Sequence, residues 1–288
     1  MTLLADVSTP IVMGVLLGGL YAVIALGLSL VFGVVKEMNI AHGDLVILGS
    51  YFAYAIMTSF GIDPILSLII GMPLLFGLGF AIQKYLLNRA FKISMDATLI
   101  IAFGISIILQ NAYQLIWTPM SRGLTTSYAL KSFSAGPISV PLVYLLNFIV
   151  AIVVMFCLRE FLRRTYLGMA IRSAAQDRKA AYLMGINTNR VYAYTFAIGM
   201  SLAAIAGVLL GLTFPFNPTS GMPFLIIALG VVVLGGLGSI AGTFIGGIAF
   251  GLAQTLGGHF FGVAAQMLVA YTMVLFVLAV IPRGIFGR

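Results

Sequence analysis

The sequence predicts an all-α, polytopic integral membrane protein, and three observations support this fold class. Hydrophobic residues make up 61% of the 288 residues. Charged residues make up only 8%, whereas about a quarter of a typical soluble domain is charged. Long uncharged stretches recur, and the longest, residues 191–282, contains no Asp, Glu, Lys or Arg. A membrane-crossing helix needs about 20 apolar residues, so such stretches can hold several spans.

The uncharged stretches divide the chain into about eight to nine spans. Turn signals built from Gly, Pro, Asn and Asp separate them at residues 61–64, 215–221, 235–239 and 257–259. Two pieces between these turns, residues 222–234 and 240–256, are short. They are either two short crossings or one re-entrant hairpin. The clear spans are residues 7–35, 45–62, 64–83, 97–117, 141–158, 191–213 and 263–281.

The sequence is organised as a single membrane domain over residues 1–288. Its parts are a first half (about 7–120), a linking span (about 141–158), a polar loop (159–190) and a second half (191–282). The polar loop carries seven of the fifteen Lys and Arg residues. If the loop is cytoplasmic, alternation places thirteen basic residues inside and only Arg122 and Lys131 outside, as the positive-inside rule requires. The amino terminus is then outside and the carboxyl terminus inside.

Composition also excludes several classes of function. The net charge of +8 lies in an apolar background, so it indicates membrane orientation and excludes a nucleic-acid partner. Cys157 is the only cysteine, so neither an intrachain disulfide nor a cysteine metal site is predicted, and no other metal site is expected. No basic residue precedes Lys36, so the first apolar run is predicted to be a retained span rather than a cleaved signal peptide.

The polar loop is predicted to contain one short helix, from Thr165 to Gly185. Its apolar residues recur at helical spacing, while Arg172, Gln176 and Lys179 share another face. Gly185 followed by Ile186 is typical of a helix end, because glycine readily takes the left-handed conformation there and an apolar residue then packs back. The helix either contacts a partner in water or is a solvated loop held inside by its charge.

Two short segments resemble each other across the two halves. N-I-A-H-G at Asn39 and N-P-T-S-G at Asn217 each follow a span and precede a shorter, glycine-bearing apolar run. They are predicted to lie on opposite faces of the membrane. Two such halves form an inverted repeat, in which the solute route lies at the repeat interface near the midplane.

Polar residues of the first segment suggest a site. Asn39, His42 and Asp44 are predicted at the cytoplasmic entrance of the second span. They either cap the start of a helix or form an inner gate. No acidic residue is predicted deep within a span, which argues against proton-coupled transport.

Glycines spaced by four residues, Gly238, Gly242 and Gly246, leave one helix face nearly bare. Such a face permits close helix packing, or it lines a solute route or a seam with a partner. The dipeptide Gly-Lys is absent, so no phosphate-binding P-loop is present. The chain is therefore predicted not to be an enzyme, and its energy comes from a partner unless transport is passive.

Three motifs in order resemble a known family: N-I-A-H-G-D from Asn39, A-A-Q-D-R-K-A-A-Y-L-M-G-I-N-T-N-R from Ala174, and G-G-L-G-S-I-A-G-T-F-I-G-G from Gly235. The chain resembles the permease subunit of branched-chain amino acid ABC importers, over nearly its whole length. The resemblance implies two cytoplasmic ATPase subunits that bind the ATP, a second permease or a copy of this one, and an extracytoplasmic solute-binding protein. It also implies a prokaryotic inner membrane and no cofactor of the chain's own.

In that family the polar loop carries a coupling helix that docks on the ATPase, which implies this role for residues 170–185. The residues assigned to coupling are Arg172, Ala175, Asp177, Ala181, Leu183, Gly185 and Ile186, with Ala181, Leu183 and Ile186 seated in the ATPase groove. Those assigned to the route or gate are Asn39, His42, Gly43, Asp44, Asn217, Gly235, Gly236 and Gly238. The implied function is import of branched-chain amino acids by alternating access. The alternatives are a passive channel or secondary carrier for a small neutral solute such as urea or amides, and a structural membrane subunit.

Overall fold

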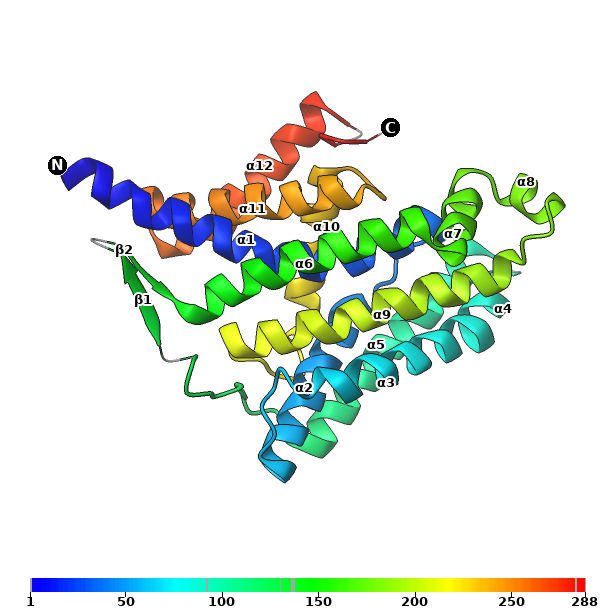
Figure 1. The fold of residues 1–288 in the computed structure, drawn as a ribbon, viewed down its shortest axis with the longest axis horizontal. Helices are drawn as coiled ribbons and strands as arrows, with labels where there is room; N and C mark the ends of the chain where they lie inside the picture. The colour runs from blue at the N-terminus through cyan, green and yellow to red at the C-terminus, as the bar shows by residue number, and fades with distance from the viewer. Residues whose placement is uncertain (1, 92, 130, 136–137, 283, 288) are drawn as a thin grey trace.

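The computed structural model describes residues 2–91, 93–129, 131–135, 138–282 and 284–287, and it is a bundle of long helices (Figure 1). A small antiparallel hairpin pairs β1 with β2, with Ser132 opposite Pro141. The helices and strands are α1 (Thr2–Val35), α2 (His42–Phe60), α3 (Leu68–Ala81), a π-helical turn (Ile82–Leu87), α4 (Asn88–Ala90), α5 (Met95–Trp117), β1 (Ser132–Ala135), β2 (Ile138–Pro141), α6 (Leu142–Arg164), α7 (Tyr166–Gln176), α8 (Arg178–Leu183), α9 (Thr188–Thr213), α10 (Gly221–Gly235), α11 (Ile240–Phe261), a 3-10 turn (Val263–Ala265) and α12 (Gln266–Val280).

The predicted all-α membrane fold is confirmed. Eight helices of the described residues are long and apolar enough to cross a membrane. Helix α10, with 15 residues, is too short to be counted with them. The chain is therefore a multi-pass membrane protein with one short apolar helix inside its second half.

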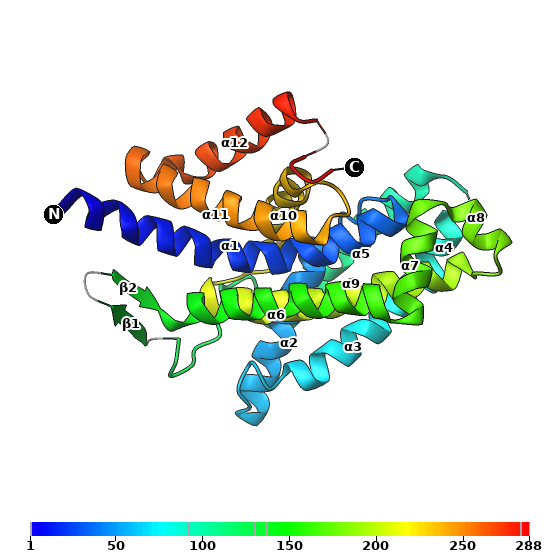
Figure 2. The same cartoon turned by 45° about the horizontal axis from the view of Figure 1, so that its top comes forward.

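The bundle has two distinct ends, and Figures 1 and 2 show them from two directions. One end carries α7 and α8 and is called the α8 end below. The other carries the β-hairpin and the start of α1, and is called the hairpin end. The predicted basic loops meet at the α8 end, where Lys84 and Arg89 line one pocket with Arg190. Three further predicted basic residues, Lys92, Arg283 and Arg288, lie outside the described residues.

The core is built around α1 and α9. In the most apolar 18 residues of α1 and of α9, 78% and 89% of the residues are buried, against 17% for α5 and 11% for α12. Facing glycines let α1 and α11 pack backbone to backbone, with Gly14 and Gly18 of α1 against Gly247 and Gly251 of α11. Small residues favour helix contact in lipid because backbones can approach closely. The close-packing interpretation of the spaced glycines therefore holds for this seam.

One predicted turn is wrong. Residues 257–259 belong to α11, which continues to Phe261. A Cβ on Gly257 would collide with Val269 of α12, and one on Gly258 with Gln266. These glycines permit a close approach between two helices, and the turn follows later, where Gly262 has φ +90°.

Candidate functional site

Helices α2 and α10 begin inside the bundle, and their first residues touch. The segment of residues 36–41 returns from the end of α1 into the interior, where His42 donates from Nε2 to the carbonyl oxygen of Ile24 at 2.9 Å. Ile24 lies near the middle of the span Val7–Val35. A Cβ on Gly43 would collide with the carbonyl oxygen of Gly221, the first residue of α10. The amino ends of the two helices therefore meet at about mid-depth.

The two resembling segments fold into the same turn. In each, the Asn side-chain oxygen accepts from the backbone amide two residues later, at 3.1 Å for Asn39 and 3.0 Å for Asn217. The Asn backbone oxygen accepts from the amide three residues later, again at 3.1 and 3.0 Å. Asn39 and Asn217 thus set up the starts of α2 and α10 in the same way.

Helices α2 and α10 then run in opposite directions. Helix α2 leads to Gly61 and Asp63, whose carboxylate accepts from the Tyr128 hydroxyl at 3.0 Å in the connection that precedes the hairpin. Helix α10 leads to the turn Gly235–Gly238. There Gly238 contacts Gly33, near the carboxyl end of α1 and away from the hairpin end. Repeated turns followed by helices of opposite direction define an inverted repeat, as predicted. The prediction that the two turns lie on opposite faces of the membrane is wrong, because the helix starts that follow them, at Gly43 and Gly221, are in contact inside the bundle.

Asp44 lies beside this junction and is only 2% exposed. Its carboxylate accepts from the Ser106 hydroxyl at 2.5 Å and from Gln110 Nε2 at 3.2 Å. A Cβ on Gly221 would collide with the same carboxylate. The amino ends of α2 and α10 carry positive partial charge, which favours a carboxylate here.

The burial of Asp44 corrects one prediction. The group of Asn39, His42 and Asp44 does not lie at the mouth of the second span, because all three residues are buried and His42 contacts the middle of α1. The physical reason is that the start of α2 lies inside the bundle, so residues of its first turn are interior residues. Asp44 still lies at the end of its span, as predicted, in the first turn of α2.

Of the predicted gate glycines, Gly43 lies at this junction and the other three do not. Gly235 packs against Gly242 of α11, and Gly236, with φ +99°, packs against Phe286 and Gly287. Gly238, with φ +80°, contacts Gly33. They form a separate turn between α10 and α11, where the close backbone contacts leave no room for a side chain.

Besides Gly221 of α10, three junction residues that lie on α5 were missed from the sequence. Ser106 and Gln110 bind the Asp44 carboxylate, and the Tyr113 hydroxyl donates to the Asp44 backbone oxygen at 2.9 Å. The available signal was the spacing of Ser106 and Gln110 by four residues within an apolar span, which puts two polar groups on one helix face.

The polar loop contains two helices rather than the single helix predicted. Asp177 separates α7 from α8, because its side chain accepts from the amides of Lys179 at 2.8 Å and Ala180 at 3.0 Å and so caps α8. These amide hydrogen bonds hold the pKa of Asp177 below its ordinary value. A single helix was predicted because the spacing of apolar residues does not show where one helix ends and the next begins. Aspartate is favoured at the start of a helix, and here Asp177 starts a second one.

The predicted end of the loop helix is confirmed in detail. Gly185 has φ +83°, its amide donates to the Tyr182 oxygen at 3.0 Å, and the Ile186 amide donates to the Ala181 oxygen at 3.0 Å. This pair of hydrogen bonds is a Schellman motif, which requires the left-handed residue that glycine supplies.

The assigned coupling residues divide between two sides of the loop. Leu183 is 83% exposed, and Arg172 and Asp177 are also exposed. Ala181 is 4% exposed and packs with Ile186 on the permease itself, while Ala175 is half-buried. Two apolar neighbours of Leu183 were missed: Tyr182 and Met184, which are 68% and 83% exposed. A cluster of exposed apolar side chains marks an interaction surface.

Arg178 connects the loop to the segment between α1 and α2. Its guanidinium carbon lies 4.5 Å from the ring centroid of Phe91 and 5.3 Å from that of Tyr192. Burial raises the pKa of Glu37 to about 7, and Thr98 and the charge of Arg178 oppose this rise. Glu37 belongs to the segment between α1 and α2. The first residue of α8 therefore acts electrostatically on the segment that leads to the half-helix α2.

The raised pKa predicts a pH-dependent stability that Glu37→Gln removes. The unfolded carboxyl ionises near its ordinary pKa of 4.5, whereas the folded one keeps its proton to about 7. The contribution of Glu37 to stability is therefore complete below pH 4.5 and is lost as pH rises through 7. In lipid nanodiscs we expect the wild-type unfolding temperature to fall more than that of Glu37→Gln over this range. Parallel falls in both proteins would contradict the assignment.

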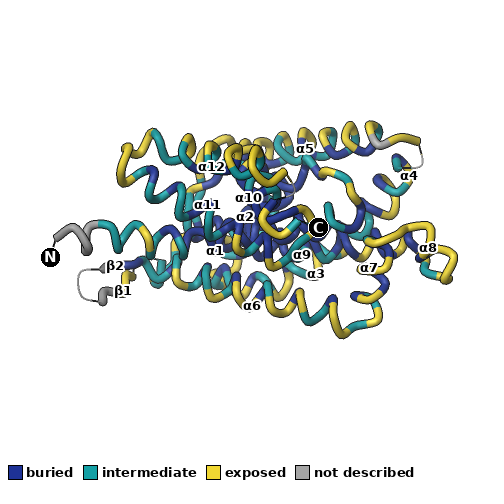
Figure 3. Tube along the Cα trace, turned by 90° about the horizontal axis from the view of Figure 1, so that it is seen from above, coloured by how far each residue is buried: buried dark blue, intermediate teal, exposed yellow. Residues whose placement is uncertain are grey.

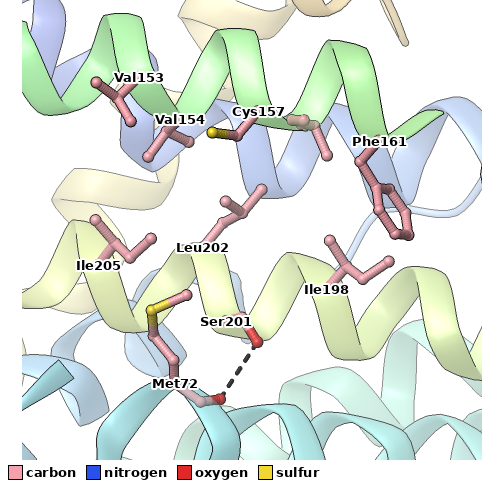
Figure 4. Close-up of a pocket in the computed structure, with 10 residues that line it drawn as sticks. Met72, Val153, Val154, Cys157, Phe161, Ile198, Ser201, Leu202 and Ile205 are labelled. Carbon is pink, nitrogen blue, oxygen red and sulfur yellow. Dashed lines mark hydrogen bonds between the residues drawn. The ribbon is translucent and has the colours of Figure 1, made fainter. Parts of the chain in front are cut away.

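A separate apolar groove lies between α3, α6 and α9 (Figure 4), with a volume of about 350 Å³. Its polar group is the Ser201 hydroxyl, which lies 3.3 Å from the backbone oxygens of Met72 and Ala197. No charged residue lines the groove, and Cys157 and Phe161 point into it from α6. Such a lining suits hydrocarbon chains rather than a polar solute, so the groove is distinct from the junction.

An inverted repeat whose broken helices meet at mid-depth is an architecture of membrane transport proteins. The fold and the junction thus define a membrane permease.

Comparison with known proteins specifies the family. The family model described as "Branched-chain amino acid transport system / permease component" matches residues 11–278. The chain is 35% identical to the high-affinity branched-chain amino acid transport system permease protein BraD of Pseudomonas aeruginosa, covering 96% of this chain and 95% of that protein. It is also 35% identical to the corresponding permease protein LivH of Escherichia coli, covering 96% and 94%. No solved structure matches the chain. The chain belongs to the permease components of branched-chain amino acid transport systems, and the resemblance seen in its motifs is confirmed.

Proposed function

We propose that this chain is the membrane subunit of an ATP-driven importer that moves branched-chain amino acids into a prokaryotic cell. Family membership supports a permease of this type. The observation that carries the proposal is the exposed apolar cluster of Tyr182, Leu183 and Met184 on a short capped helix outside the membrane-spanning part. A water-exposed cluster of this kind calls for a protein partner.

The partners follow from this role. Two cytoplasmic ATPase subunits bind the ATP and dock at the α8 end, which makes that end cytoplasmic and places the start of α1 outside. A second, related permease or another copy of this chain completes the membrane part, and an extracytoplasmic binding protein delivers the solute. The collection of basic residues at the α8 end supports this orientation.

Transport is proposed to proceed by alternating access. Closure of the ATPase dimer would push α8, and Arg178 would transmit the movement to Glu37 and the segment before α2. That segment ends at the contact of Gly43 with Gly221, so a shift there would separate or join the two half-helices. Packed elements of this kind switch between discrete arrangements rather than deforming continuously.

One observation favours a second candidate, a proton-coupled secondary carrier. Asp44 is an ionisable group buried within the membrane part, and such groups are characteristic of proton relays in carriers. A carrier needs no ATPase, so retention of that partner separates the two candidates.

The proposal is tested by isolating the tagged chain from native membranes and identifying retained ATPase subunits. Asp177→Lys combined with Gly185→Pro removes the cap and the end of α8, and we expect the ATPase to be lost. Gly61→Pro is the matched control, because Gly61 is also a left-handed glycine that ends a helix with open space around it, but lies away from the loop. Equal retention by both variants, or no ATPase with the wild type, would refute docking at α8.

A further inference from the structure

Helix α5 carries a row of polar side chains along one side of its span. Asn111 lies off this row, and its side-chain amide donates to the Ile107 backbone oxygen at 2.8 Å. Ser106, Gln110 and Gln114 are spaced by four residues, which places them along one helix face. Ser106 lies near the middle of the span Asp96–Trp117, and the other two follow toward its end. The three side chains are called the α5 stripe below.

The stripe becomes more exposed with distance from the junction. Ser106 is buried, Gln110 is half-buried and Gln114 is exposed. The side-chain amide of Gln114 has no hydrogen-bond partner among the described residues. In the hydrocarbon core an unsatisfied amide is costly, because no water is present to pair with it. A stripe of this kind therefore faces water or polar groups rather than lipid.

The buried end of the stripe reaches a carboxylate. Gln110 Nε2 lies 3.2 and 3.3 Å from the two oxygens of Asp44, and Ser106 donates to one of them. No Lys or Arg forms an ion pair with Asp44 in the described part of the chain. A carboxylate has about four acceptor positions, so Asp44 can accept further N–H groups. A protonated amine would complement its charge.

The stripe also lies on the least covered side of the protein. Helices α5 and α12 are the least buried spans, and Figure 3 shows both along the same long edge, with α10 between them. This edge includes the helix whose first residue forms the junction. A route along the stripe thus connects an uncovered side of the bundle to its mid-depth site.

We propose that the solute route runs along the α5 stripe, from its exposed end at Gln114 past Gln110 to Asp44, and that Asp44 receives the ammonium group of an amino acid. This inference rests on the proposed function, since it names the part of the permease that the solute contacts. It assigns the outer half of the route to α5, which the sequence motifs did not include.

The test is thiol labelling of the whole transport complex in vesicles, in a Cys157→Ala background. Gln110→Cys and Gln114→Cys are expected to react with a membrane-impermeant thiosulfonate at least about tenfold faster than two controls, as water-lined positions do relative to lipid-facing ones. The controls are Ile108→Cys, on another side of α5, and Val153→Cys in the middle of α6, which are 68% and 54% exposed. Gln114→Cys removes no hydrogen bond, so its folding is not at issue. Labelling of both stripe positions at the control rate would overturn the route.

Binding of the ammonium group at Asp44 is tested separately, by measuring whether a solute protects Gln110→Cys from labelling. Leucine and 3-methylbutylamine are expected to slow the reaction, whereas 4-methylpentanoate, which lacks the amine, is not. Equal protection by 4-methylpentanoate would overturn recognition at Asp44. ATP-driven uptake by the Cys157→Ala parent, which carries no change in the stripe, is measured first. Absence of that uptake contradicts the proposed function, whereas normal uptake by the parent with an unreactive stripe contradicts only this inference.

Discussion

Gly43→Val is expected to remove nearly all folded protein from the membrane. The added Cβ would meet the Gly221 carbonyl oxygen, which belongs to the backbone of α10, and Leu225 one turn further on. Backbone cannot move aside as a side-chain end can, and overpacking a closely packed site costs about 1–3 kcal/mol or more. The two half-helices would have to separate at the centre of the bundle. We expect the yield of monodisperse protein to fall at least about tenfold, as this cost implies.

The matched controls are Gly77→Val in α3 and Gly104→Val in α5. Both glycines lie in helices, and a Cβ at either position meets nothing within 4 Å. Their yields are expected to stay close to that of the wild type. If Gly43→Val gives as much monodisperse protein as these controls, the half-helices do not meet as described.

Leu183→Glu is expected to abolish transport while leaving the permease folded. Leu183 is 83% exposed, so the substitution disturbs no contact within the chain. In the complex it would place a charge in the apolar contact with the ATPase. Substitution of a central interface residue costs on the order of 2 kcal/mol, which corresponds to roughly a 30-fold loss of binding. The measurement is the rate of leucine uptake by reconstituted complex at limiting ATPase concentration.

Met120→Glu provides the control for Leu183→Glu. Met120 is also an exposed apolar residue, at 69%, but it follows α5 in the connection to the hairpin. Its uptake is expected to match that of the wild type. Normal uptake by Leu183→Glu would place the docking surface elsewhere.

Features decided within a few residues could be predicted from the sequence. The uncharged runs predicted the spans, and Gly185 with Ile186 predicted a helix end that has the expected backbone conformation. The repeated Asn turns predicted the inverted repeat, because the turn depends on hydrogen bonds within three residues of Asn39 and Asn217.

Features decided by contacts between residues far apart in the sequence could not be predicted from it. The depth of Asp44 depends on the meeting of Gly43 with Gly221, which are far apart in the sequence. Hydropathy reports a polar interruption between two apolar runs, but not that the chain returns into the bundle there. Gly257 and Gly258 were predicted to form a turn because the local sequence does not show their packing partners. Those partners are Val269 and Gln266 in the next helix. For the same reason, the role of Ser106 and Gln110 became apparent only when α2 placed Asp44 beside them.

The central claim is that a separate ATPase drives this permease, and ATP dependence of uptake tests it most directly. Vesicles containing the intact complex and its solute-binding protein are loaded with ATP or with a non-hydrolysable analogue, and radiolabelled leucine uptake is measured in both. The account predicts accumulation above the external concentration with ATP and none with the analogue. Equal uptake under the two conditions would contradict it and identify a passive channel or an ion-coupled carrier.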